Sequence, residues 1–145
     1  MPAETIPATQ DAVRRAQAAV QSLYLADRAS QSLGIEILDI APGQVRLAMT
    51  VRPDMLNGVG VCHGGIIFTL ADSAFAFACS SYGEPMVAAG AQIEFIAPTP
   101  GGERLTATAT EVSRGARHGI YDVTVTTAAG VTVAHFRGRC SRLRT

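Results

Sequence analysis

The sequence predicts an α+β domain in which an antiparallel sheet packs around one buried helix. Helical and strand-like patterns follow in the order helix, two strands, helix and four strands, which favours antiparallel pairing over repeated βαβ units. The second helical stretch has almost no polar face, as is typical of a buried helix. With 145 residues, 48% of them hydrophobic and 17% charged, the chain is long and apolar enough to bury a core.

The N-terminal part contributes a tail, a helix and two strands. We expect residues 1–8 to form a flexible tail and residues 9–145 to form a single domain. Thr9 suits a helix N-cap, and apolar residues then recur at steps of three and four until Gly34, which predicts a helix that ends there. Strand-like runs at 35–40 and 45–51 follow, separated by a turn at 41–43.

The remainder is predicted to hold the second helix and four strands. A loop rich in glycine leads into a helix at about 64–81. The strands are expected at 86–96, 104–112, 120–127 and 131–142, with turns between them that contain glycine. Residues 120–125 alternate between apolar and polar side chains, as a half-buried strand does.

The charge composition excludes several function classes. Twelve arginines and twelve acidic residues give a net charge of zero, which argues against nucleic-acid binding driven by net charge. The chain has no lysine, which excludes Schiff-base chemistry and a P-loop. Residues 114–145 nevertheless carry six arginines and one acidic residue. This local excess is either chance with protection of a sheet edge or a site for a small polyanion.

Three cysteines without a CxxC motif argue against a disulfide scaffold and a zinc ribbon. No secretory signal and no apolar stretch of membrane-spanning length is visible. We therefore expect a cytoplasmic protein with no metal, no resident cofactor and no membrane or nucleic-acid partner.

The candidate catalytic groups lie at the start of the second helix and at Asp72. Gly64 and Gly65 follow His63 and leave free N–H groups at the positive end of the helix dipole, a potential oxyanion site. Asp72 lies in the middle of the apolar helix and has no basic residue three or four positions away. It is either a structural carboxylate hydrogen-bonded to a loop or a general base or nucleophile.

The spacing of these groups predicts a shared site. Gly64 and Asp72 are eight residues apart, about 12 Å along a helix, so one carbonyl cannot contact both in one chain. A twofold dimer would bring Asp72 of one subunit to Gly64 of the other. The catalytic interpretation therefore requires a homodimer.

These residues also carry a family resemblance. The resemblance rests on residues 57–58, 62–65, 68, 70–72 and 74–76, and it continues through 94–95, 98, 105–109, 119–122 and 136–138. These segments are similar to the hotdog-fold acyl-CoA thioesterases, most of all those of phenylacetate degradation. The resemblance implies a sheet wrapped around a long central helix, with an additional N-terminal helix. It also implies hydrolysis of acyl-CoA, with phenylacetyl-CoA or a ring-hydroxylated relative as substrate, and dimers that pair into tetramers.

By position, the resemblance assigns the catalytic carboxylate to Asp72 and the N–H that polarises the thioester carbonyl to Gly64. The supporting histidine and asparagine fall on His63 and Asn57. Whether Asp72 attacks the carbonyl or activates water stays open. Some relatives carry a hydroxyl residue where this chain has Ala88 and Ala89.

The same resemblance suggests where the rest of the substrate binds. Coenzyme A, here part of the substrate, carries phosphates that arginine side chains suit. The candidates for this contact are Arg114, Gly115, Arg137 and Arg139. The candidates for the acyl pocket are Met55, Leu56 and Phe68.

Two other functions remain as alternatives. A hotdog dehydratase or hydratase acting on acyl thioesters is a lyase, and the pattern of His63, Gly64 and Asp72 fits it poorly. A non-catalytic acyl-CoA binding module is the second alternative, and an intact Asp72 argues against it.

Overall fold

The computed structural model describes residues 7–144 and confirms the predicted α+β class. Part of the expected tail, residues 1–6, lies outside the described residues. The elements are α1 (Gln10–Ala26), α2 (Arg28–Ser32), β1 (Glu36–Ala41), β2 (Gln44–Thr50), the 3₁₀ turn η1 (Pro53–Met55), α3 (Gly64–Ser80), β3 (Met86–Phe95), β4 (Arg104–Arg114), β5 (His118–Thr127) and β6 (Thr132–Arg142).

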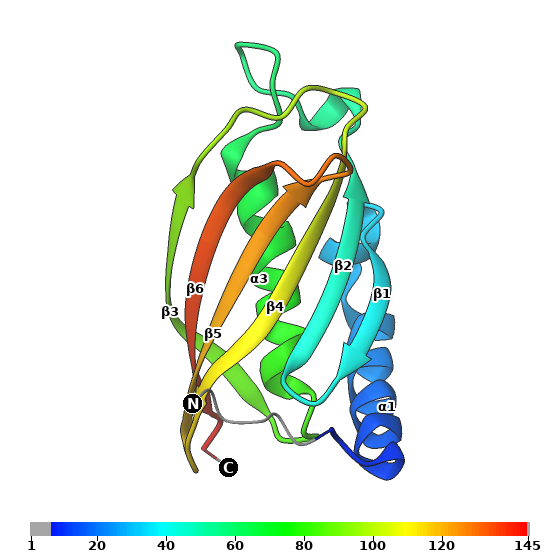
Figure 1. Cartoon of the computed structure of the whole chain (residues 1–145), viewed down its shortest axis with the longest axis vertical. Coiled ribbons are helices and arrows are strands. Elements are labelled where there is room, and N and C mark those ends of the chain that lie inside the picture. Colours follow the sequence, from blue (N-terminus) through cyan, green and yellow to red (C-terminus); the bar gives the residue numbers. More distant parts are fainter. Residues whose placement is uncertain (1–6, 145) are drawn as a thin grey trace.

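The six strands form one antiparallel sheet in the order β1-β2-β4-β5-β6-β3. Helix α3 crosses one face of this sheet, and α1 lies beside it near β1 (Figure 1). Strands β1 and β3 are therefore the two edges. The strand that follows the central helix ends up at the edge farthest from α1.

The core lies between α3 and the sheet, as the apolar sequence of α3 predicts. Its largest fully buried side chains include Phe75, Tyr121, Leu47 and Leu70. Gly138 of β6 lies directly under the Phe75 ring, where an added Cβ would come within 2.7 Å of ring carbons. The close approach of sheet and helix at this point depends on that glycine.

The prediction of one helix from Thr9 to Gly34 is wrong in one respect. Thr9 caps α1 as expected, since its Oγ1 accepts from Ala12 N at 3.2 Å. The helix is interrupted at Asp27, whose carboxylate accepts from Ser30 N at 2.9 Å and caps the short helix α2. This side-chain hydrogen bond offers the backbone an alternative to continuing α1.

The strands were predicted within a few residues of their observed bounds. The largest differences are at the turn between β4 and β5, where pairing continues to Arg114 and resumes at His118. The turn is closed by a bond from Gly115 N to His118 O of 2.8 Å. Cys62, Cys79 and Cys140 are buried free thiols, as the absence of a disulfide pattern predicted.

Candidate active site

The first turn of α3 presents a single available backbone donor. His63 is the N-cap residue, and its Nδ1 accepts from Gly65 N at 2.9 Å. The His63 carbonyl accepts from Ile66 N at 2.9 Å. Gly64 N–H donates to no group in the described part of the chain. It lies at the positive end of a 17-residue helix, where a developing negative charge is stabilised.

His63 holds the first turn of α3 by accepting a hydrogen bond from its backbone. Because Nδ1 accepts a hydrogen bond from a backbone N–H, the neutral imidazole carries its proton on Nε2. The ring closes the helix end and leaves Gly64 as the free donor. This geometry gives Nδ1 no part as a base, and the supporting role of His63 stays a prediction.

A hollow of about 270 Å³ lies beside Gly64, between the start of α3 and the end of β3. Its lining includes Asn57, Cys62, Ile67, Phe95 and Thr99. The Phe95 ring rests on Gly64, where an added Cβ would lie 3.1 Å from Phe95 Cζ. Glycine at this position therefore lets an aromatic ring approach the free N–H.

Asn57 faces the same hollow with a defined amide orientation. Its Oδ1 accepts from Val59 N at 3.0 Å and from Val61 N at 3.2 Å. These two bonds fix the loop and direct Oδ1 toward the backbone. The Nδ2 group donates to nothing among residues 7–144, so it is available to a substrate, a water molecule or a carboxylate.

Asp72 lies away from this hollow, about two turns further along α3. It is half-buried and belongs to a stripe at helical spacing, Gly65, Thr69, Asp72 and Ala76, that neither the sheet nor α1 covers fully. Burial raises the pKa of the Asp72 carboxyl, and the nearby Asp27 carboxylate raises it further. In the described residues no hydrogen bond to the Asp72 carboxylate is present, which disfavours the structural interpretation of this residue.

A hydrogen-bonded chain fixes α3 next to Asp72. Ser30 Oγ donates to Asp27 Oδ2 at 2.6 Å, so the proton of Ser73 Oγ points to Ser30 Oγ at 2.9 Å. Ser30 and Ser73 are buried. The junction of α1 and α2 is thereby joined to the residue that follows Asp72. The sequence analysis missed Asp27, because its only signal was a helix-capping residue inside an otherwise continuous helical pattern.

The predicted coenzyme A residues do not form one cluster. Arg137 and Arg139 both lie on the exposed face of β6, opposite the face that packs on α3. Arg137 makes two bonds to Asp122, of 2.6 and 2.8 Å, and this pairing lowers the pKa of the Asp122 carboxyl. Arg139 donates to Ala89 O at 3.3 Å.

Arg114 lies elsewhere, 3.6 Å over the ring of Tyr82, a residue that follows α3. Its neighbour Gly115 serves the turn between β4 and β5. The coenzyme A roles of these residues stay predictions, and each of the three arginines already has a partner within the chain.

The predicted acyl-pocket residues are also separate from the hollow beside Gly64. Met55 is part of the core at 2% exposure, and its carbonyl accepts from His63 N at 2.8 Å. Leu56 packs toward Gly101. Phe68 is half-buried, with its ring edge-on to Phe136 at 5.4 Å between centroids. Their pocket role stays a prediction.

Thr99 is a residue of the hollow that sequence reasoning missed. It is fully buried, and its Oγ1 has no hydrogen-bond partner within residues 7–144. A threonine between two prolines gave no signal beyond a turn.

Residues 7–144 contain neither a candidate metal site nor a candidate membrane span. No cluster of three or more His, Cys, Asp or Glu side chains within residues 7–144 has the arrangement of a metal site. None of the described helices has the length and hydropathy needed to span a bilayer.

Comparisons with known proteins agree on one family. Residues 59–134 match the family model described as "Thioesterase superfamily". The chain is 42% identical over 122 residues to "Acyl-coenzyme A thioesterase PaaI" of Escherichia coli, covering 84% of this chain and 87% of that protein. It is 32% identical over 106 residues to human "Acyl-coenzyme A thioesterase 13", covering 71% of this chain and 76% of that protein.

Solved structures give the same result. The structure of E. coli PaaI, described as a protein of the phenylacetic acid degradation operon, superposes with a TM-score of 0.90 at 39% identity, covering 91% of this chain and 96% of that one. A mutant of the phenylacetic acid degradation protein PaaI from Thermus thermophilus superposes with a TM-score of 0.78 at 39% identity, covering 81% of this chain and 100% of that one.

Proposed function

Because the chain belongs to the thioesterase superfamily, we propose that it hydrolyses acyl-coenzyme A thioesters to the free acid and coenzyme A. We further propose that each active site is built by two copies of the chain. Gly64, His63 and Asn57 come from one subunit, and Asp72 comes from the other.

The proposal of a shared site rests on one observation. The free Gly64 N–H and the unpaired Asp72 carboxylate are eight residues apart on a single helix, about 12 Å, and a reacting carbonyl must lie within about 3 Å of both. A twofold axis resolves this conflict, because it places Asp72 of each subunit near Gly64 of the other.

Strand β3 and the open stripe of α3 offer the surface for a second copy. Strand β3 is an edge strand of ten residues, and it carries no lysine or proline that would protect the edge. Val87 is 42% exposed and Phe95 is 53% exposed. Antiparallel pairing of two β3 strands would extend the sheet and cover the half-buried stripe that contains Asp72. We expect two such dimers to associate into a tetramer.

The chemistry follows from these groups. Attack on the thioester carbon moves negative charge onto the carbonyl oxygen, where Gly64 N–H donates to it. Asp72 of the second subunit either attacks to form a mixed anhydride, which water then cleaves, or removes the proton from an attacking water. The carbon–sulfur bond breaks, and the coenzyme A thiolate leaves and takes up a proton. Asn57 Nδ2 holds the water or the Asp72 carboxylate, because Ala88 and Ala89 supply no hydroxyl for this task.

The proposed acyl group is phenylacetyl or a ring-hydroxylated phenylacetyl. This part of the proposal is supported by the E. coli relative, whose structure is described as coming from the phenylacetic acid degradation operon. The hollow beside Gly64 adds support, since Ile67, Phe95 and Ile96 give it apolar walls suited to an aromatic ring.

A free-thiol release assay tests the proposal. The substrates are phenylacetyl-, hydroxyphenylacetyl-, benzoyl-, medium-chain and acetyl-coenzyme A. We expect an aryl preference for the wild type, and a loss of about 10²–10⁴ in kcat for Asp72→Asn, which removes the base or nucleophile. Asp11→Asn, at an exposed carboxylate of α1, is the matched control and should leave kcat unchanged. Absence of release from every thioester, or a near-normal kcat for Asp72→Asn, would overturn the proposal.

A further inference from the structure

A buried hydrogen bond joins the middle of α3 to the short helix α2. Ser73 Oγ lies 2.9 Å from Ser30 Oγ, and the two residues are 8% and 1% exposed. Ser30 Oγ in turn donates to Asp27 Oδ2 at 2.6 Å. Among the described residues, the bond between Ser73 and Ser30 is the only hydrogen bond that a side-chain oxygen of α3 makes to another element.

The other contacts of α3 hold it less firmly against rotation about its own axis. Ala71, Ala74 and Ala78 are fully buried, and hydrophobic contacts of such small side chains have no preferred direction. A hydrogen bond is directional. Because successive residues are about 100° apart around a helix, the bond that holds Ser73 also fixes the direction in which Asp72 points.

The junction between α1 and α2, which carries Ser30, is itself held in place. The Tyr24 hydroxyl of α1 donates to Ile35 O at 2.6 Å. The Tyr24 ring meets the Phe77 ring edge-on, at 6.3 Å between centroids. Phe77 follows Ser73 by four residues and therefore lies on the same face of α3, one turn further along. Two contacts, one polar and one aromatic, thus fix α3 against this junction.

The geometry points to Ser73 and Ser30 as positioning residues for Asp72. They fix where the Asp72 carboxylate lies when it meets Gly64 of the second subunit, and this inference rests on the proposed function. A reacting group must lie within about 3–3.5 Å of the atom that it attacks, so a small rotation of α3 lowers the rate. The proton of Ser73 points to Ser30, so the two hydroxyls act on the position of the carboxylate without donating to it.

Asp27 adds a charge to the hydrogen bond that it accepts. It is the one charged group within residues 7–144 that acts on the Asp72 carboxyl, whose pKa it raises; no group of β2, β3, β4, β5 or β6 does so, and α3 has no other charged side chain. An asparagine at position 27 can still bond to Ser30, because its Nδ2 donates to Ser30 Oγ. Asp27→Asn therefore removes the charge and keeps the chain of bonds, whereas Ser73→Ala cuts the chain and keeps the charge.

Steady-state thiol release from the acyl-coenzyme A that the wild type hydrolyses fastest separates these two effects. For Ser73→Ala we expect kcat to fall about 10- to 10²-fold, with KM and the acid limb of the pH profile unchanged. For Asp27→Asn we expect the acid limb to move to lower pH, with most of the plateau kcat retained. Ser32→Ala is the matched control, because it removes an exposed hydroxyl of α2 that donates to Ala29 O at 2.8 Å, and it should leave kcat unchanged.

A second variant shows whether the two hydroxyls act through their mutual bond. Ser30→Ala breaks the same bond from the α2 side and leaves the sequence of α3 intact. We expect it to lose about as much kcat as Ser73→Ala, and we expect the double variant to lose no more than either alone. Circular dichroism and thermal melting establish that the compared variants are folded.

The outcomes separate this inference from the proposed function. A near-normal kcat for folded Ser73→Ala and Ser30→Ala, beside an inactive Asp72→Asn, overturns the positioning role alone. Losses that add in the double variant, an equal loss in Ser32→Ala, or a rise in KM without a loss of kcat also overturn it. A near-normal kcat for Asp72→Asn overturns the proposed function, and the positioning role with it.

Discussion

Replacing Gly64 by proline would remove the one backbone donor that the proposed mechanism assigns to the thioester carbonyl. Proline is tolerated at the first position of a helix, and Gly64 is the first residue of α3. The preceding residue also fits, because His63 has φ −59° and ψ 132°, the extended conformation that a following proline requires. The substitution therefore deletes an N–H group while the helix start is kept.

The expected magnitude follows from the hydrogen bonds of the first turn. Gly65 N is bound to His63 Nδ1 and Ile66 N to the His63 carbonyl, so neither can replace the lost donor. Loss of one such donor costs about 10²–10³ in kcat, or about 2.7–4 kcal/mol.

Gly64→Ala is the matched control, because it adds the same Cβ against Phe95 and keeps the N–H. Both variants are compared with the wild type by steady-state thiol release from phenylacetyl-coenzyme A. The alanine variant should retain most of the wild-type kcat, whereas the proline variant should lose it. Equal kcat values for the two would refute the role of the Gly64 N–H.

Two further predictions concern the pKa of Asp72 and the core. Asp27→Asn removes a negative charge that raises the Asp72 pKa, so the acid limb of the kcat/KM profile should move to lower pH, because Asp72 then stays ionised in more acidic solution. An acid limb that does not move, or that moves upward, would contradict this origin of the shift. Gly138→Ala places a Cβ 2.7 Å from Phe75 ring carbons, and overpacking of about 1–3 kcal/mol should lower Tm by about 3–10 °C. Gly58→Ala is the control and should leave Tm nearly unchanged, because nothing lies within 4 Å of the added Cβ. Equal Tm values for the two variants in calorimetric melting would contradict the overpacking at Gly138.

Periodicity predicted the elements that bury a regular apolar face. The apolar residues of α3 and the alternation along β5 each repeat with the period of their structure, so both elements could be located from the sequence. The break at Asp27 could not, because it depends on a hydrogen bond to Ser30 within an otherwise helical pattern.

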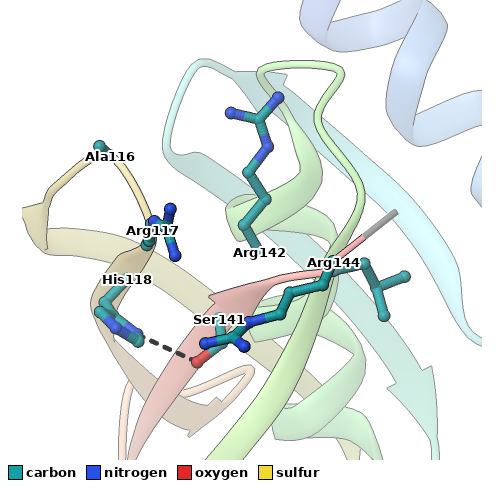
Figure 2. A pocket seen from close by; sticks show the side chains of 7 residues that line it. Ala116, Arg117, His118, Ser141, Arg142 and Arg144 are labelled. Atoms are coloured by element: carbon teal, nitrogen blue, oxygen red, sulfur yellow. Dashed lines mark hydrogen bonds between the residues drawn. The ribbon is translucent and has the colours of Figure 1, made fainter.

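The sequence allowed candidate site residues to be chosen, but it did not show the hydrogen bonds and ion pairs that these residues make. Helix geometry alone separates Gly64 from Asp72 and led to the expectation of two subunits. The ion pair of Arg137 with Asp122 depends on the register of β5 against β6, which the sequence does not display. The excess of arginine after residue 113 was visible in the sequence. That Arg117, Arg142 and Arg144 lie around one hollow (Figure 2) depends on the fold, which brings the turn between β4 and β5 next to the end of β6.

Subunit complementation tests the shared active site most directly. The variants Gly64→Pro and Asp72→Asn are each expected to be nearly inactive, and they are mixed after dissociation or produced together in one cell. With random association, half of the dimers are mixed and each contains one intact site, so the account predicts recovery of about a quarter of wild-type activity. A mixture that shows mixed dimers and no more activity than its two parents would contradict a site built from two chains.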